Sequence, residues 1–146
     1  MNLSIFAESL SELILEANLT PSAFAEQLGC GKGTISRYLN GNKMPSIELL
    51  VRMADFFQCS TDYLLGIETE KYPRVFKAMI PFQQRLPLLC KHLNTTKAEM
   101  KRKCEFAESA IYFWQSGDRK PSLDSIYKIA VAYNCSIDFI LGRSDF

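Results

Sequence analysis

Residues 19–66 read LTPSAFAEQLGCGKGTISRYLNGNKMPSIELLVRMADFFQCSTDYLLG, and this stretch decides the fold. Thr20 followed by Pro21 is an N-cap with a proline in the first helical turn, so a short helix begins there. Gly29 supplies a tight turn, after which another helix runs from about Lys32 to Leu39. Two short helices joined by a tight glycine-containing turn predict a helix-turn-helix, whose second helix enters the major groove of DNA.

Apolar periodicity predicts further helices on both sides of this element. Residues 3–17 carry apolar side chains at three- and four-residue steps, the spacing of an amphipathic helix. Pro45-Ser46 caps a fourth helix, Ser60 caps a fifth, and Gly66 ends it. The side chains expected in the core are Leu3, Phe6, Leu10, Leu13, Ile14, Ala17, Phe24, Ala25, Leu28, Ile35, Tyr38, Ile47, Leu50, Val51, Ala54, Phe57, Tyr63, Leu64 and Leu65.

The chain also repeats itself without gaps at a shift of 76 residues. The superimposed identities are mostly turn, helix-capping and core residues, for example Gly41 on Gly117, Pro45 on Pro121 and Gly66 on Gly142. Two copies of one small fold would retain this pattern, because such residues set backbone geometry. We therefore expect an all-α protein with two tandem five-helix domains, residues 1–66 and 82–146. The linker, residues 67–81, contains Pro73 and Pro81 and is expected to form a short helix.

The run TIS-R-Y-LNG…P-S and the later S-x-D-x-LLG resemble the Cro/phage-repressor-like (XRE) helix-turn-helix family. Residues 98–145, AEMKRKCEFAESAIYFWQSGDRKPSLDSIYKIAVAYNCSIDFILGRSD, resemble it again, so the two matches cover most of the chain. The resemblance implies two five-helix, lambda-repressor-like domains, sequence-specific operator binding and frequent dimerisation.

In the first domain the predicted helix 32–39 directs Ile35 and Tyr38 into the core, which leaves its other face for DNA. The groove-facing residues, at positions that match the family's, are Lys32, Gly33, Ser36 and Arg37. Arg37 can make two parallel hydrogen bonds to guanine, and Thr34 or Ser36 can contact a base or a phosphate. The expected phosphate contacts are Ser22, Asn40, Asn42 and Lys43. The resemblance implies Gln where this chain has Pro21, so one phosphate contact is missing.

A solvated helix face is the alternative interpretation of Lys32 and Arg37. The first domain has four basic and seven acidic residues, a net charge of −3, which does not favour DNA. Three of the four basic residues nevertheless flank the helix at 32–39.

The second domain has ten basic and seven acidic residues, a net charge of +3, but its reading helix is different. Glu108, Ser109, Tyr112 and Phe113 replace the first domain's groove-facing set, which is a weak combination for reading bases. Its expected DNA contacts are Lys97, Lys101, Ser109, Tyr112, Arg119 and Lys120. Exposed Tyr112 and Phe113, with Phe106 nearby, could instead form a dimerisation or partner surface.

Two local departures separate the second domain from the first. Glu105 replaces the turn glycine, which costs about 1 kcal/mol if the left-handed conformation is kept. Pro87 falls inside the first helix of the domain and should kink or shorten it.

Composition excludes several other classes of protein. Five cysteines form no CxxC pair and His92 is the only histidine, so neither a zinc site nor a disulfide framework is expected, and buried reduced thiols are. The sequence shows no phosphate loop, nucleophile elbow or paired catalytic carboxylates, so no cofactor and no enzymatic activity are expected. No signal peptide or membrane span is evident, and we expect a cytoplasmic, nucleoid-associated protein.

Two functions remain in competition. The first is a bacterial or phage-type transcriptional regulator, acting as a repressor, that binds double-stranded DNA as a homodimer or with its two domains on neighbouring groove segments about 34 Å apart. The second is a protein-interaction module, such as an antitoxin or phage-encoded inhibitor, that keeps the fold and reuses the groove face.

Overall fold

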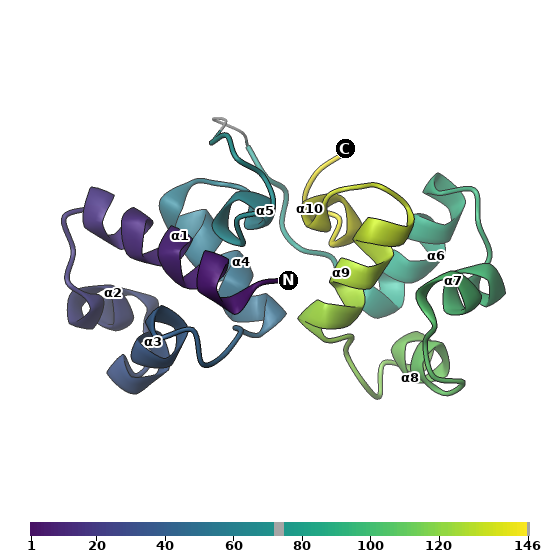
Figure 1. Cartoon of the computed structure of the whole chain (residues 1–146). Helices are drawn as coiled ribbons and strands as arrows, with labels where there is room; N and C mark the ends of the chain where they lie inside the picture. Colours follow the sequence, from purple (N-terminus) through teal and green to yellow (C-terminus); the bar gives the residue numbers. More distant parts are fainter. Residues whose placement is uncertain (72–74, 146) are drawn as a thin grey trace. The chain divides into compact units, whose positions relative to one another are not determined.

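The computed structural model describes residues 1–71 and 75–145, and the chain divides into two compact units, Met1–Arg74 and Val75–Phe146. All regular elements in these described ranges are helices (Figure 1). The first unit contains α1 (Leu3–Glu16), α2 (Pro21–Leu28), α3 (Lys32–Leu39), α4 (Ile47–Phe57) and α5 (Thr61–Leu64). The second contains α6 (Phe82–His92), α7 (Lys97–Cys104), α8 (Ala110–Ser116), α9 (Leu123–Ala132) and α10 (Ile137–Ile140).

Side-chain caps fix where corresponding helices begin in both units. Thr20 Oγ1 accepts a hydrogen bond from Ala23 N at 3.1 Å, and Thr96 Oγ1 accepts one from Glu99 N at the same distance. Ser46 and Ser122 cap α4 and α9, and Ser60 and Ser136 cap α5 and α10. An N-cap hydroxyl satisfies a backbone donor that the first helical turn leaves open. The predicted starts at Thr20, Ser46 and Ser60 are therefore confirmed.

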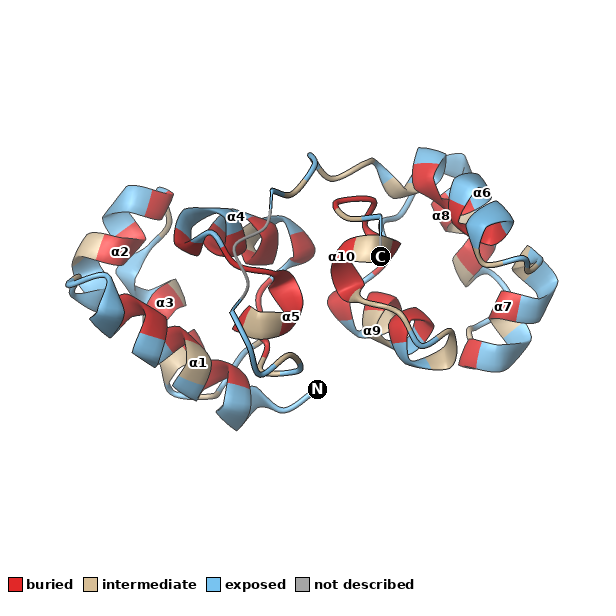
Figure 2. Ribbon diagram, turned by 90° about the horizontal axis from the view of Figure 1, so that it is seen from above, coloured by how far each residue is buried: buried red, intermediate tan, exposed pale blue. Residues whose placement is uncertain are grey.

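Each unit closes its core around an aromatic pair at the same repeat position. Phe6 meets Tyr38 edge-on with ring centroids 5.9 Å apart, and Phe82 meets Trp114 at 5.7 Å. These contacts join the first helix of a unit to its third, so they help to fix the position of the third helix against the core. Buried residues, drawn red in Figure 2, occur on every helix and alternate with exposed ones along the longer helices.

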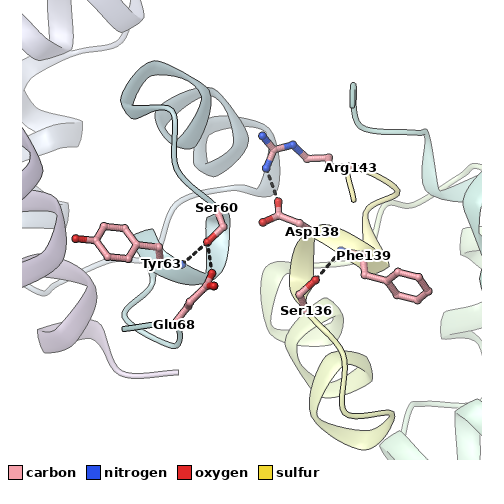
Figure 3. A network of polar contacts seen from close by, with 7 residues as sticks. All are labelled: Ser60, Tyr63, Glu68, Ser136, Asp138, Phe139 and Arg143. Atoms are coloured by element: carbon pink, nitrogen blue, oxygen red, sulfur yellow. Dashed lines mark hydrogen bonds and ion pairs between the residues drawn. The ribbon is translucent and has the colours of Figure 1, made fainter. Parts of the chain in front are cut away.

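Polar groups secure the end of each unit. Ser9 Oγ donates to Tyr63 O at 3.2 Å, and its counterpart in the repeat, Arg85, donates to Phe139 O at 2.6 Å. In the first unit Ser60 Oγ also donates to the Glu68 carboxylate at 2.7 Å (Figure 3). In the second unit a buried ion pair joins Arg143 to Asp138 (Figure 3). The repeat therefore preserves the location of the contact made by Ser9 and Arg85 while changing its chemistry. The other two contacts join positions that are not equivalent in the repeat.

The segment before α6 differs from expectation. Residues 67–71 and 75–81 contain no helix, so the prediction of a linking helix is wrong for the described part of the linker, and Pro73 lies outside it. Lys77 N donates to Arg143 O at 2.8 Å and Ile80 N donates to Leu141 O at 3.2 Å. These backbone hydrogen bonds hold the segment extended along the end of the second unit, which a helix could not do.

Three side chains expected in the core are less buried than predicted. Leu3 is 37% exposed, Ala17 is exposed and Tyr63 is half-buried. Leu3 and Ala17 lie at the two ends of α1, where less of the unit covers the helix.

The cysteine prediction holds for three of the five thiols. Cys59, Cys90 and Cys104 are buried, whereas Cys30 and Cys135 are only half-buried, so the expectation of burial is wrong for these two. Burial raises the pKa of the Cys90 and Cys104 thiols, which favours their neutral form.

Among the described residues, none of the helices combines the length and the apolar character needed to cross a bilayer.

Candidate nucleic-acid interface

The turn between α2 and α3 presents α3 at the surface of the first unit. Gly29 ends α2 with φ 71° and ψ 30°, the left-handed conformation that favours glycine. Its Cys30 neighbour donates from the backbone to Ala25 O at 3.0 Å, which closes the turn. The Arg52 guanidinium from α4 donates to Leu28 O and secures the end of α2. Residues 1–66 contain four basic residues, so this hydrogen bond commits one of them to the fold and leaves three near α3.

One face of α3 is buried in the core, and the other is polar and mostly exposed. Ile35 and Tyr38 are buried, as predicted, and Tyr38 is anchored by Phe6. Burial raises the pKa of the Tyr38 hydroxyl, which favours its neutral form. Lys32, Gly33 and Arg37 are exposed, and Thr34 and Ser36 are half-buried. The observed bounds Lys32–Leu39 agree with the predicted helix.

The remaining predicted contacts of the first unit are at the surface. Asn40 directly follows α3, and Asn42 and Lys43 lie in the loop that leads to α4; all three are exposed. Asn42 N donates to Arg37 O at 3.0 Å, so this loop folds back on the end of α3. Ser22 is exposed as the second residue of α2. Hydroxyl, amide and ammonium donors at these places are of the kind that contact DNA phosphates.

The corresponding turn in the second unit has a different local structure. Helix α8 begins at Ala110, so the expectation that Glu108 and Ser109 lie on the helix is wrong. The Lys101 ammonium and the Glu108 carboxylate form an ion pair at 2.7 Å, and their hydrogen bond lowers the pKa of Glu108. This pair holds Glu108 toward α7 and occupies a predicted DNA contact. Lys97 is half-buried, and Ser109 is exposed.

An aromatic and basic cluster forms on α8 and the loop after it. Tyr112 is 64% exposed and meets Phe113 edge-on at 5.6 Å. Arg119 places its guanidinium over the ring of Phe113, with Cζ 4.3 Å from the ring centroid. Phe113 is half-buried as a result, so the prediction that it is exposed is wrong. Lys120, adjacent to Arg119, is exposed.

Phe106 does not belong to this cluster. It packs edge-on against Trp114 at 5.0 Å and is half-buried. Trp114 itself is buried, as is Tyr38 at the equivalent position of the first unit.

Three contacts that shape these surfaces escaped sequence reasoning: Arg52 to Leu28, Lys101 to Glu108, and Arg119 to Phe113. Each joins residues of different elements or of a helix and a loop. No periodicity in the sequence marks such pairs. The opposite charges of Lys101 and Glu108 are the one sequence signal from which a contact of this kind could have been predicted.

Comparison of the sequence with known proteins shows the family to which the chain belongs. A family model described as helix-turn-helix matches residues 10–64 and again residues 88–140. The chain belongs to this helix-turn-helix family, in its XRE-type form. The two matches span α2–α3 and α7–α8, so both tandem copies are members of the family.

Two relatives of this helix-turn-helix protein occur in Bacillus subtilis (strain 168). The chain is 38% identical over 64 residues to the HTH-type transcriptional regulator AnsR, covering 44% of this chain and 55% of AnsR. It is 30% identical over 71 residues to the uncharacterized HTH-type transcriptional regulator YobD, covering 49% of this chain and 63% of YobD. The chain thus spans little more than half the length of these relatives. No solved structure matches it significantly.

Proposed function

We propose that this protein is a sequence-specific, double-stranded-DNA-binding transcriptional regulator, acting as a repressor, that reads the major groove with α3. The observation that carries the proposal is the division of α3 into a buried apolar face and an exposed polar face. Ile35 and Tyr38 hold the helix in the core, while Lys32 and Arg37 project from its other side. The family membership and the names of the two Bacillus relatives support the same function.

The chemistry of this face fits both base and phosphate contacts. The Arg37 guanidinium can donate two parallel hydrogen bonds to guanine O6 and N7, the strongest base-specific contact that a side chain of α3 offers. Thr34 and Ser36 supply hydroxyls for a base or a phosphate, and Lys32 supplies a charge. Ser22, Asn40, Asn42 and Lys43 would contact phosphates on either side and fix the register of α3 on the duplex.

Substitution of Arg37 tests the proposal. A duplex selected from a random pool should bind the wild-type protein tightly, and Arg37→Ala should weaken that binding by about 10-fold to 100-fold, the effect of removing one bidentate base contact. Arg37→Lys keeps the charge but not the planar fork, so it should retain non-specific binding and lose most of the discrimination.

Lys71→Ala is the matched control, because it removes one exposed positive charge from the segment after α5. Equal affinity of wild-type and Arg37→Ala proteins for the selected duplex at fixed salt would contradict the proposal. The same titrations, followed by sedimentation, distinguish a homodimer from a single chain with both domains on the duplex through the stoichiometry of protein to duplex.

The second unit is proposed to contact the DNA backbone rather than its bases. The net charge of +3 over residues 82–146 suits phosphates, and Arg119, Lys120 and Lys97 provide donors. Stacking on Phe113 holds the Arg119 guanidinium in one orientation and leaves its edge for an anion.

A specific observation also favours a second candidate, a protein-interaction role for the second unit. Tyr112 is the most exposed aromatic side chain among the described residues, and it lies where the first unit has Ser36. Exposed aromatic residues flanked by arginine are typical of protein interfaces. A partner that co-purifies with the wild-type chain and is absent with Tyr112→Ala, together with no retention on any duplex at low salt, would favour this role over DNA binding.

A further inference from the structure

Gly33 is a glycine for which the fold of the described chain provides no reason. It is the second residue of α3, is exposed, and does not have the positive φ that makes Gly29 necessary in the preceding turn. A Cβ atom built on Gly33 meets no atom within 4 Å apart from its chain neighbours and the adjacent backbone of its own helix. Neither backbone conformation nor crowding within the unit therefore excludes a side chain at this position.

A glycine without such a reason lowers stability. Glycine has more conformational freedom in the unfolded chain than alanine has, and it loses that freedom when the helix forms. Alanine at the same position would keep the helical backbone and reduce this entropic loss. Gly33 thus weakens the free protein, and an interaction with another molecule can supply a compensating benefit.

The position of Gly33 indicates where that molecule lies. Residues three and four apart share one face of a helix, so Gly33 lies on the same face as Ser36 and Arg37. Its neighbour Lys32 is exposed beside it. The polar face of α3 therefore lacks a side chain at one position, Gly33.

We propose that the missing side chain at Gly33 is a specificity determinant, because it lets the backbone of α3 touch a base edge on the floor of the major groove. This inference rests on the proposed function. A Cβ atom extends about 1.5 Å from the backbone, enough to lift α3 and take Arg37 out of hydrogen-bonding distance of its guanine. A non-specific complex is held by phosphates alone, so it does not require this close approach.

Gly33→Ala separates the inference from its alternatives when folding and binding are measured on the same full-length protein. The variant should unfold at a temperature about 2–5 °C higher than the wild type, because alanine fits the helical backbone. Its dissociation constant for the selected duplex should rise at least 10-fold, while affinity for random duplex stays within about 2-fold of wild type. Gln27→Ala, at an exposed position on α2, is the control and should leave both affinities unchanged.

Each other outcome overturns the inference in a recognisable way. A lower unfolding temperature for Gly33→Ala would show that the fold itself requires the glycine. Unchanged affinity for the selected duplex, in an experiment where Arg37→Ala does lose affinity, would refute the role of Gly33 and leave the proposed function intact. If the wild-type protein binds no duplex at all, the proposed function fails and the inference fails with it.

Discussion

Gly29 and Glu105 occupy the same turn in the two units and have nearly the same backbone conformation. Gly29 has φ 71° and ψ 30°, and Glu105 has φ 55° and ψ 42°. A residue with a Cβ is strained in this region because the Cβ approaches its own backbone, whereas glycine is not. The second unit has therefore kept the turn, and Glu105 is strained in it. This cost is the one predicted from the sequence for the case in which the left-handed conformation is retained.

Glu105→Gly should stabilise the second unit by about 0.5–1 kcal/mol, the relief of strain less the greater freedom of glycine in the unfolded chain. Gly29→Ala is the reciprocal change and should destabilise the first unit by about 1 kcal/mol. Its Cβ would have only an ordinary contact, 3.8 Å from Arg52 Nη2, so the destabilisation measures backbone strain rather than a clash. Urea denaturation of both variants measures these changes. Destabilisation by Glu105→Gly would mean that the carboxylate of Glu105 stabilises the unit in its own right.

At the scale of the element, α6 continues through a proline. Its counterpart α1 runs from Leu3 to Glu16, and the repeat would start the second copy at residue 79, but α6 starts at Phe82. The helix is shorter at its beginning, next to Pro81, and not at Pro87. Pro87 has no N–H to donate to Gln83 O, so one backbone hydrogen bond inside α6 is missing.

Pro87→Ala should restore that hydrogen bond and stabilise the second unit by about 1–3 kcal/mol. Chemical denaturation gives the free energy of unfolding, and far-UV circular dichroism gives the helical content, which should not fall. Leu88→Ala is the neighbouring control: its side chain is 45% exposed, so its removal should have a small effect. An unfolding free energy for Pro87→Ala at or below that of the wild type would show that the ring's packing outweighs the missing bond.

Local chemistry explains which elements could be predicted from the sequence. Hydroxyl caps at Thr20, Ser46 and Ser60 and the turn glycine Gly29 act over three or four residues, so their spacing in the sequence determines where helices start and stop. The start of α3 at Lys32 followed from these signals.

Interactions between distant residues explain what could not be predicted. Helix α8 begins two residues later than the repeat suggests, in a turn where Glu108 pairs with Lys101 on α7. The segment before α6 is extended because Lys77 and Ile80 donate backbone hydrogen bonds to residues more than sixty positions later. The positions of Arg37 and Lys32 on the surface followed from periodicity, but the anchoring of Arg52 and Arg119 depends on contacts that periodicity does not encode.

At the scale of the whole molecule, charge is distributed unequally between the two copies. Residues 1–66 are net negative with three of their four basic residues near α3, and residues 82–146 are net positive with basic residues on α7 and around Arg119. A duplex bound by both copies would therefore receive base contacts from the first and mainly phosphate contacts from the second.

Arg119→Ala combined with Lys97→Ala should weaken binding to selected and random duplexes by similar factors. Removing one phosphate interaction reduces the slope of log affinity against log salt by about 1, so the double variant should have a slope shallower by about 2. Fluorescence anisotropy across a salt series measures both quantities. A change in the base sequence selected by the double variant would instead give the second unit a role in reading bases.

Dimethyl sulfate footprinting of the selected duplex tests directly whether α3 reads the major groove, as proposed. The reagent methylates guanine at N7, which faces the major groove, and adenine at N3, which faces the minor groove. Wild-type protein should protect guanine N7 within the site, and Arg37→Ala should lose that protection at one guanine in each half-site. Protection confined to adenine N3, or guanine protection that Arg37→Ala leaves unchanged, would contradict major-groove reading by α3.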